Sequence, residues 1–285
     1  MKAKLVWGFA LLGASLLGLL LSPLNERFLG RKRLRFPYLA RPIAAEQYAA
    51  LAARPGWSKS ELEVAPGVTL RGLLRKPNAA AADWVLFYPG NDESQLERGQ
   101  AFLQSLGDDA SWGLAVFAYR GYDASDGKPK LSDMQADAPQ ILARLCASQG
   151  VAPARVHLVG FSIGGHFAVH AAAGAAQRGQ RAASLTLLAS VDDIVMVHPS
   201  PWEKLSLGED YQTRPFLGGV PAPVLVVQGT ADVALAGPQQ GRDLAAALGP
   251  RGRYLELEGV EHVPLLQNAV ALDAVRAFIR QHTPP

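Results

Sequence analysis

A short β-prone run, a serine between two glycines and an alanine-rich segment follow one another in residues 155–174 of the 285-residue chain. The run favours a strand and the alanine-rich part favours a helix, so we expect a strand, a sharp turn and a helix. Gly160 and Gly164 lack the Cβ atoms that would collide around Ser162 in such a turn. The pattern G-x-S-x-G is typical of a nucleophile elbow, which projects its serine at the top of a sheet.

Ser162 has two interpretations at this point. It caps the helix that follows it, or it is a nucleophile that attacks a bound carbonyl. In the second case the N–H of Ile163 and the helix dipole favour the oxyanion that forms there. Catalysis also requires a base, an acid and a second oxyanion donor.

The rest of the chain alternates between strand and helix patterns. A hairpin is expected at 61–64 and 68–75, further strands at 84–88, 114–119, 184–188, 224–228 and 254–257, and helices near 132–148, 239–248 and 265–280. Another helix follows Pro89-Gly90-Asn91-Asp92, with Asp92 or Ser94 as its cap. Because such alternation requires right-handed crossovers, the fold class is α/β, with a mostly parallel central sheet and helices on both faces.

His262 is the leading candidate for the base, because it lies on a loop after the last expected strand. Asp232 is the leading acid, since it follows strand 224–228 and precedes His262 in the order nucleophile, acid, histidine. Asp192 and Asp193 follow the preceding strand and remain alternative acids. All these positions lie at the carboxyl edge of the sheet, where ligands bind in α/β folds.

The second oxyanion donor is expected to be the backbone N–H of Asn91, since Gly90 lets the main chain approach closely. His166 and His170 are four residues apart, but no third metal ligand is near them, so we interpret both as packing or surface residues. This chemistry requires neither a metal nor an organic cofactor. Cys146, the single cysteine, is expected to be a buried structural thiol.

Residues 5–21 carry no charge, and Lys2 and Lys4 precede them. No small-x-small cleavage site follows, so the pattern predicts an uncleaved N-terminal transmembrane helix rather than a signal peptide. Residues 1–36 hold seven basic side chains and one acidic one, and the remainder carries a net charge of −3. This distribution favours a membrane over a nucleic acid as the partner, whereas basic residues on both sides of the span leave the orientation open.

The sequence thus divides into a membrane anchor at 1–24, a basic arm and linker at 25–59, and a catalytic domain at 60–285. A short helix is expected within the linker near 46–53. An irregular, proline-containing stretch at about 190–220 predicts a short cap over the site, with an ordinary surface connection as the alternative. Its apolar residues suit a small-molecule or lipid acyl substrate, and the oligomeric state stays open.

Residues 60–281 resemble the α/β-hydrolases, and specifically the membrane-associated serine hydrolases of the BEM46 and ABHD13 type. The matching features are Tyr88-Pro89-Gly90-Asn91, Tyr119-Arg120-Gly121-Tyr122 with Ser125, Gly127 and Pro129, the elbow at 160–164, Gly229 with Asp232, and Gly259 with His262. The resemblance implies an α/β-hydrolase fold, a Ser162, Asp232 and His262 triad, and an amino-terminal anchor.

Two positions depart from this family's pattern. Pro89 stands where a histidine is usual, which removes a side-chain hydrogen bond that helps to fix the loop, and Asp123 stands where a glycine is usual. Neither change removes a catalytic group. The sequence therefore predicts a membrane-anchored serine hydrolase that cleaves ester, thioester or amide bonds through an acyl-enzyme at Ser162. The alternative is a non-catalytic α/β-hydrolase-fold protein that binds a ligand or partner at the membrane.

Overall fold

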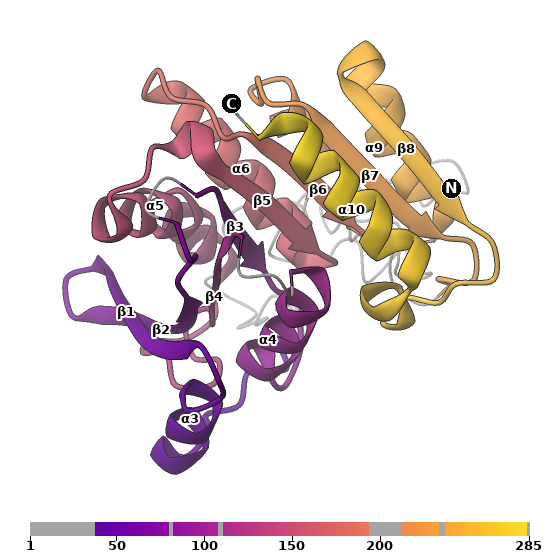
Figure 1. Ribbon diagram of the computed structural model, residues 1–285. Coiled ribbons are helices and arrows are strands. Elements are labelled where there is room, and N and C mark those ends of the chain that lie inside the picture. The colour runs from indigo at the N-terminus through magenta and orange to yellow at the C-terminus, as the bar shows by residue number, and fades with distance from the viewer. Residues whose placement is uncertain (1–37, 80–81, 108–110, 194–211, 234–236, 284–285) are drawn as a thin grey trace, which may run out of the picture.

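The structure is a computed structural model that describes residues 38–79, 82–107, 111–193, 212–233 and 237–283. These residues form one eight-stranded sheet with helices on both faces (Figure 1). The spatial order of the strands is β1-β2-β4-β3-β5-β6-β7-β8. The strands are β1 (Trp57–Ala65), β2 (Val68–Arg75), β3 (Trp84–Tyr88), β4 (Gly113–Phe117), β5 (Val156–Phe161), β6 (Ser184–Leu188), β7 (Val224–Gly229) and β8 (Gly252–Leu257).

Two helix layers enclose the sheet. Helices α4 and α10 pack on one face, and α5, α6 and α9 cover the other (Figure 1). The helices are α3 (Ala45–Ala52), α4 (Gln95–Leu106), α5 (Leu131–Gln149), α6 (Ile163–Gln177), α8 (Arg214–Leu217), α9 (Pro238–Leu248) and α10 (Ala269–His282). Short 3₁₀ turns lie at η1 (Pro153–Arg155), η3 (Gly249–Arg251) and η4 (Pro264–Gln267).

The pairing of the strands confirms the mostly parallel sheet. Strands β3 to β8 pair in parallel, whereas β1 and β2 form the expected antiparallel hairpin and β2 pairs antiparallel with β4. Every residue of the central strands β3, β4, β5, β6 and β7 is buried, because helices cover both faces of a parallel sheet. Since β3 lies between β4 and β5, the ends of β3 and β5 are adjacent, with Tyr88 opposite Gly160.

The packed structure extends to the amino-terminal side of residue 60. Helix α3 lies where a short helix is expected, and its residues Tyr48 and Leu51 are buried. The Tyr48 hydroxyl donates a hydrogen bond of 2.8 Å to the backbone oxygen of Gly72 in β2. This part of the linker is therefore joined to the sheet by both apolar packing and a buried hydrogen bond.

Two helix starts differ from the sequence prediction. Ser94 occupies the N-cap position of α4 as expected, but its side chain makes no cap hydrogen bond; the carboxylate of Asp123, distant in sequence, instead accepts from the backbone N–H of Leu96 at 2.6 Å. The expected helix at 265–280 is divided into η4 and α10. Asn268 causes this break, since its side chain accepts from the N–H of Ala271 at 3.1 Å and caps α10 there.

Within the described residues, no helix is both long enough and apolar enough to cross a membrane. The expected anchor at 5–21 and most of the expected cap lie outside those residues. The same holds for the apolar cap residues Ile194, Val195, Met196, Trp202 and Leu205.

Candidate active site

Ser162 lies at the junction of β5 and α6, with φ 55° and ψ −126°. A non-glycine residue in this conformation is strained, and the surrounding backbone must hold it there. Glycines make the required close approach possible: a Cβ on Gly160 would lie 2.5 Å from the oxygen of Gly164, and one on Gly164 would lie 2.1 Å from the oxygen of Tyr88. The expected strand, turn and helix are therefore present, with the geometry of a nucleophile elbow.

The two expected oxyanion donors come from adjacent elements. Ile163 is the first residue of α6, and Asn91 lies in the loop that follows β3. Gly90 brings this loop against the elbow, because a Cβ on it would lie 3.0 Å from the Phe161 ring and 3.2 Å from Cβ of Ser162. The pairing of β3 with β5 thus places the loop containing Asn91 beside the serine.

Asp232 and His262 are held together at the same edge of the sheet. The distance between His262 Nδ1 and Asp232 Oδ2 is 2.7 Å, and the Asp232 carboxylate also accepts from Gln228 Nε2 at 3.1 Å. Asp232 is 1% exposed, and the side chain of His262 is 12% exposed. The imidazole therefore has one nitrogen on a buried carboxylate, which is how a triad acid orients its base.

Hydrogen bonds join the two loops that carry Asp232 and His262. The N–H of Ala231 donates to the oxygen of Val260 at 3.1 Å, and the N–H of Gly259 donates to Thr230 Oγ1 at 2.9 Å. Gly229 permits this, since a Cβ there would lie 2.0 Å from the oxygen of Val260. The glycine before Asp232 therefore lets the His262 loop close onto the end of β7.

The alternative acid Asp192 has a different partner. Its carboxylate binds the guanidinium of Arg214, with Oδ2 2.8 Å from Nε, and Oδ1 accepts from the backbone N–H of Arg214 at 3.1 Å. The backbone N–H groups of Asp192 and Asp193 both donate to Gln240 Oε1, at 2.7 and 3.2 Å. Of the three candidate aspartates, Asp232 is the one whose carboxylate the structure places on His262.

Ser162 and His262 line one cavity of about 630 Å³. Leu39, Phe161 and Val263 give it apolar surface, and the rings of Phe161 and His262 have centroids 4.8 Å apart. Its other walls come largely from the loop after β3 and the first turns of α4. The remaining lining residues are Gly90, Asn91, Asp92, Glu93, Ser94, Glu97, Arg98, Ala101 and Gln267.

Three side chains to which the sequence analysis assigned no individual role hold the loop at 89–91. Tyr119 Oη donates to the oxygen of Pro89 at 2.9 Å, and Gln95 Nε2 donates to the oxygen of Gly90 at 2.9 Å. Tyr122 Oη donates to Asn91 Oδ1 at 2.6 Å. The motif Tyr119-Arg120-Gly121-Tyr122 was the available signal, although the sequence alone assigns no role to its hydroxyl groups.

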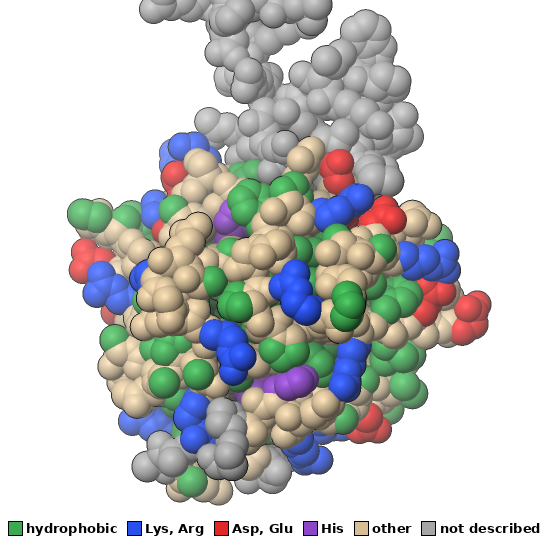
Figure 2. Space-filling view, turned by 90° about the horizontal axis from the view of Figure 1, so that it is seen from above, with side chains coloured by type: hydrophobic (Ala, Val, Ile, Leu, Met, Phe, Trp, Pro, Cys, Tyr) green, Lys and Arg blue, Asp and Glu red, His purple; other side chains and the backbone are tan. Residues whose placement is uncertain are grey.

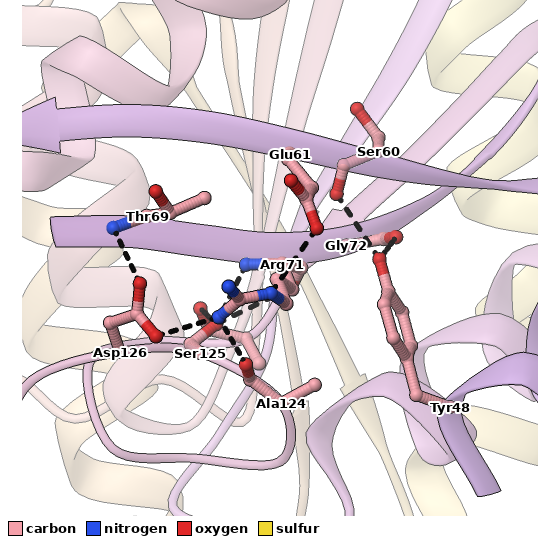
Figure 3. A network of polar contacts seen from close by, with 10 residues as sticks. Tyr48, Ser60, Glu61, Thr69, Arg71, Gly72, Ala124, Ser125 and Asp126 are labelled. Atoms are coloured by element: carbon pink, nitrogen blue, oxygen red, sulfur yellow. Dashed lines mark hydrogen bonds and ion pairs between the residues drawn. The ribbon is translucent and has the colours of Figure 1, made fainter. Parts of the chain in front are cut away.

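The loop that continues from Tyr122 is fixed to β2. Ser125 Oγ accepts from the N–H of Arg71 at 2.8 Å, and the Arg71 guanidinium lies 2.7 Å from Asp126 Oδ1 (Figure 3). Asp126 Oδ2 also accepts from the N–H of Thr69 at 3.2 Å. Tyr122 therefore projects from a loop that is anchored to the sheet.

Asp123, where a glycine is usual in the resembling family, has φ 47° and is buried. Its carboxylate lies at the start of α4, where a negative charge complements the helix dipole. Burial nevertheless raises the pKa of Asp123 to about 6, because the charged form is desolvated. Asp123, the residue that departs from the family pattern, thus supplies the side-chain cap of α4 that Asp92 and Ser94 do not supply.

The other two histidines singled out in the sequence lie away from this cavity lining. His166 is buried, with Nδ1 3.0 Å from Thr213 Oγ1 and Nε2 2.9 Å from Gln135 Nε2. Burial lowers the pKa of His166 to about 3 and that of His170 to about 4. Among the described residues, no group of three or more His, Cys, Asp or Glu side chains is placed to hold a metal ion. Cys146 is a buried free thiol, as expected.

Solved structures similar to this one include several named as hydrolases or esterases. An alpha-beta hydrolase from Vibrio vulnificus matches with a TM-score of 0.68 and 21% identity, over 92% of this chain and 93% of that chain. The esterase RhEst1 from Rhodococcus sp. ECU1013 matches with a TM-score of 0.61 and 18% identity, over 78% and 98% respectively. The chain therefore has the α/β-hydrolase fold.

No family model matches the sequence. The uncharacterized protein Rv2307c of Mycobacterium tuberculosis is 33% identical over 204 residues, which are 69% of this chain and 69% of that protein. The chain belongs to the same family as Rv2307c.

Proposed function

We propose that this chain is a serine hydrolase that cleaves carboxylic ester, thioester or amide bonds through an acyl-enzyme on Ser162. The observation that carries the proposal is a shared cavity: Ser162, on a strained elbow, and His262, oriented by Asp232, both line it. A serine hydroxyl is a weak nucleophile near neutral pH, so it requires this kind of base beside it. The esterase and the alpha-beta hydrolase among the similar structures support the same reaction class.

The proposed reaction has two halves. His262 takes the proton of Ser162 Oγ as this oxygen attacks the substrate carbonyl, and Asp232 stabilises the imidazolium that forms. The N–H groups of Ile163 and Asn91 stabilise the oxyanion, which collapses as His262 gives its proton to the leaving alcohol, thiol or amine. Water, deprotonated by His262, then attacks the acyl-enzyme and releases the acid and Ser162.

A small-molecule or lipid acyl substrate is proposed because the cavity has apolar side chains beside the serine. Leu39 and Val263 are 45% and 42% exposed, so they offer apolar surface to an acyl group at the cavity. The proposal includes a hydrolase domain at 60–285 with a cap near 190–220. It also assigns the chain to the BEM46 and ABHD13 type of serine hydrolase.

The direct test combines covalent labelling with an activity screen. The purified full chain is incubated with a fluorophosphonate, which reacts with activated serines, and with aryl esters of increasing acyl length. We expect labelling of Ser162 and hydrolysis of at least part of the ester series. A chain that is folded yet inert to the fluorophosphonate and to every ester would support the non-catalytic, ligand-binding alternative.

We also propose that residues 1–24 anchor the chain in a membrane and that residues 25–59 link this anchor to the domain. The uncharged run at 5–21, with no cleavage site after it, supports this proposal. The full chain is expected to stay in the membrane fraction after an alkaline carbonate wash, and protease access from either face would define its orientation. A mature chain that begins after Ser22 would instead identify the segment as a signal peptide.

A further inference from the structure

The loop that carries the proposed oxyanion donor Asn91 is held by side chains outside the triad. In the resembling family a histidine at the position of Pro89 helps to fix this loop, and the proline cannot do so. Here hydroxyl and amide groups bind the loop at three successive residues, as described above. The third contact differs from the others, because Tyr122 binds the side chain of Asn91 rather than a loop carbonyl.

Asn91 Oδ1 accepts from two donors that come from different parts of the chain. Tyr122 Oη lies 2.6 Å from it, and the backbone N–H of Leu39 lies 2.8 Å from it. Two donors on one side-chain oxygen restrict the χ rotation of Asn91 and the backbone to which it is joined. Burial raises the pKa of Tyr122 well above its usual value, so the hydroxyl keeps its proton and remains a donor.

Residues 38–43, here called the arm segment, are attached to the same unit. The N–H of Ile43 donates to the oxygen of Asp123 at 3.0 Å, and the N–H of Asp123 donates to the oxygen of Arg41 at 2.8 Å. Pro42 and Asp123 form a parallel bridge, and Arg41 pairs with Glu93 at 2.8 Å. The arm segment therefore lies against both Tyr122-Asp123 and the loop of Asn91.

We infer that Tyr122 and the arm segment are positioning elements for the oxyanion donor Asn91, so that turnover depends on residues between the proposed anchor and the domain. The inference rests on the proposed function. The backbone N–H of Asn91 stabilises charge that exists only in the transition state, so a displaced Asn91 lowers kcat and leaves substrate binding nearly unchanged. A side chain that served only to stabilise the fold would lower the melting temperature without this separation of kcat from KM.

The first experiment removes the Tyr122 hydroxyl from the full chain. In Tyr122→Phe we expect kcat to fall about tenfold to a hundredfold, less than the ~10²–10³ lost when an oxyanion donor is deleted outright. KM should change little. A trifluoromethyl ketone, whose adduct with Ser162 carries the same oxyanion, should bind more weakly by a similar factor.

Tyr48→Phe is the matched control. Its hydroxyl also makes a buried hydrogen bond, in this case to the backbone oxygen of Gly72 in β2 (Figure 3), and Tyr48 is not among the residues that line the cavity. It should lose a comparable amount of thermal stability and keep the wild-type kcat. Equal kcat in wild type and Tyr122→Phe would overturn the inference while leaving the hydrolase intact.

The second experiment tests the arm segment in the full chain. Leu39→Pro removes the backbone N–H that binds Asn91 Oδ1, whereas Leu39→Ala keeps it and shortens a side chain that lines the cavity. We expect Leu39→Pro to lower kcat and Leu39→Ala to change mainly KM. Equal kcat in the two variants would contradict the role of the arm segment. A wild-type chain inert to fluorophosphonate and all esters would overturn the proposed function and this inference with it.

Discussion

In the described part of the chain, two sets of Ser, His and Asp side chains lie at opposite edges of one sheet. At the carboxyl edge, Ser162 and His262 line the cavity and Asp232 lies behind them. At the amino edge, His157 Nδ1 lies 2.7 Å from Ser184 Oγ, and His157 Nε2 lies 3.5 Å from Asp83 Oδ2. Each set thus has a histidine close to an aspartate, so that contact alone does not distinguish the candidate active site from the second set.

Access and backbone geometry do distinguish the two sets. His157 and Ser184 are fully buried within strands, and Asp83, which precedes β3, is 2% exposed and pairs with Arg155 at 2.8 Å. Ser162 instead follows its strand, with a positive φ and with glycines that open the turn. A nucleophile requires a substrate to reach it, and Ser162 lines the cavity, whereas Ser184 is fully buried.

The surfaces above the two sets also differ. Figure 2 looks onto the amino edge, and Lys and Arg side chains are spread across it, with Asp and Glu towards its rim. Helices α6 and α10 end at this edge, and the α6 cap residue Arg178 and Arg280 in the last turn of α10 complement their dipoles. These two arginines thus have a structural role at the helix ends.

The sharpest test of the comparison replaces each serine. Ser162→Ala should abolish fluorophosphonate labelling and lower kcat by about 10⁴–10⁶, because the nucleophile and its base act as a unit. Ser184→Ala should keep both labelling and kcat, with a lower melting temperature from the lost contact to His157. Labelling is read by in-gel fluorescence and peptide mapping. Labelling that persists in Ser162→Ala and disappears in Ser184→Ala would exchange the roles of the two sets.

The aspartates provide the next largest contrast. Asp232→Asn keeps the shape of the side chain but favours the wrong tautomer of His262, so kcat should fall by about 10⁴ with little change in folding. Asp192→Asn, which alters a group bound to Arg214, should change kcat less than about tenfold. Steady-state kinetics with one aryl ester compares the two variants. Nearly full activity in Asp232→Asn and loss in Asp192→Asn would move the acid to the end of β6.

Local sequence was sufficient to predict the elements of this fold, but not their order. Trp84–Tyr88 and Gly113–Phe117 are both buried throughout, so their patterns do not show which strand pairs with β5. That choice depends on the crossover connections, which hydrophobic patterning does not encode. In the sheet, the order of β3 and β4 is the reverse of their order in the sequence, so β3 lies next to β5. This order places the loop of Asn91 beside Ser162.

The same limit applies to the site. The placement of Ser162, Asp232 and His262 at one edge of the sheet was predictable, because each lies at or just after the carboxyl end of a strand. The roles of Tyr122 and Asp123 were not, because their partners Asn91 and Leu96 lie 31 and 27 residues away in sequence. Contacts of this kind depend on the strand order, so their roles emerge only in the folded chain.

A smaller effect is expected when the ion pair of the amino-edge set is removed. Asp83→Asn keeps a hydrogen-bonding side chain but removes the negative charge that faces Arg155 and His157. Leaving such buried polar groups imperfectly paired should lower the free energy of unfolding by about 1–3 kcal/mol. Urea unfolding followed by circular dichroism measures this loss, and kcat should stay at the wild-type value. A large fall in kcat with unchanged stability would give the amino-edge set a catalytic role.

The smallest expected effect is a pH dependence of the free energy of unfolding that comes from the amino-edge set. Burial lowers the pKa of His157 below the value of 6.5 that it has when exposed, and the nearby Asp83 carboxylate opposes this shift only in part. As the pH falls below 6.5, the unfolded chain therefore binds a proton that the folded chain does not, and the free energy of unfolding decreases. This decrease is at most about 1.4 kcal/mol per pH unit and ends once the lowered pKa is passed.

His157→Asn keeps a polar group near the position of Nδ1 but cannot titrate, so its stability should depend less on pH between neutrality and mild acid. Ser184→Ala retains the imidazole and should keep the wild-type slope. Urea unfolding at several pH values, from about 7.5 down to about 5, compares the three chains across the expected window. Equal slopes in wild type and His157→Asn would mean that His157 binds its proton as readily in the folded chain as in the unfolded one. The amino-edge histidine would then be a charged partner of Asp83 rather than a neutral one sealed in the core.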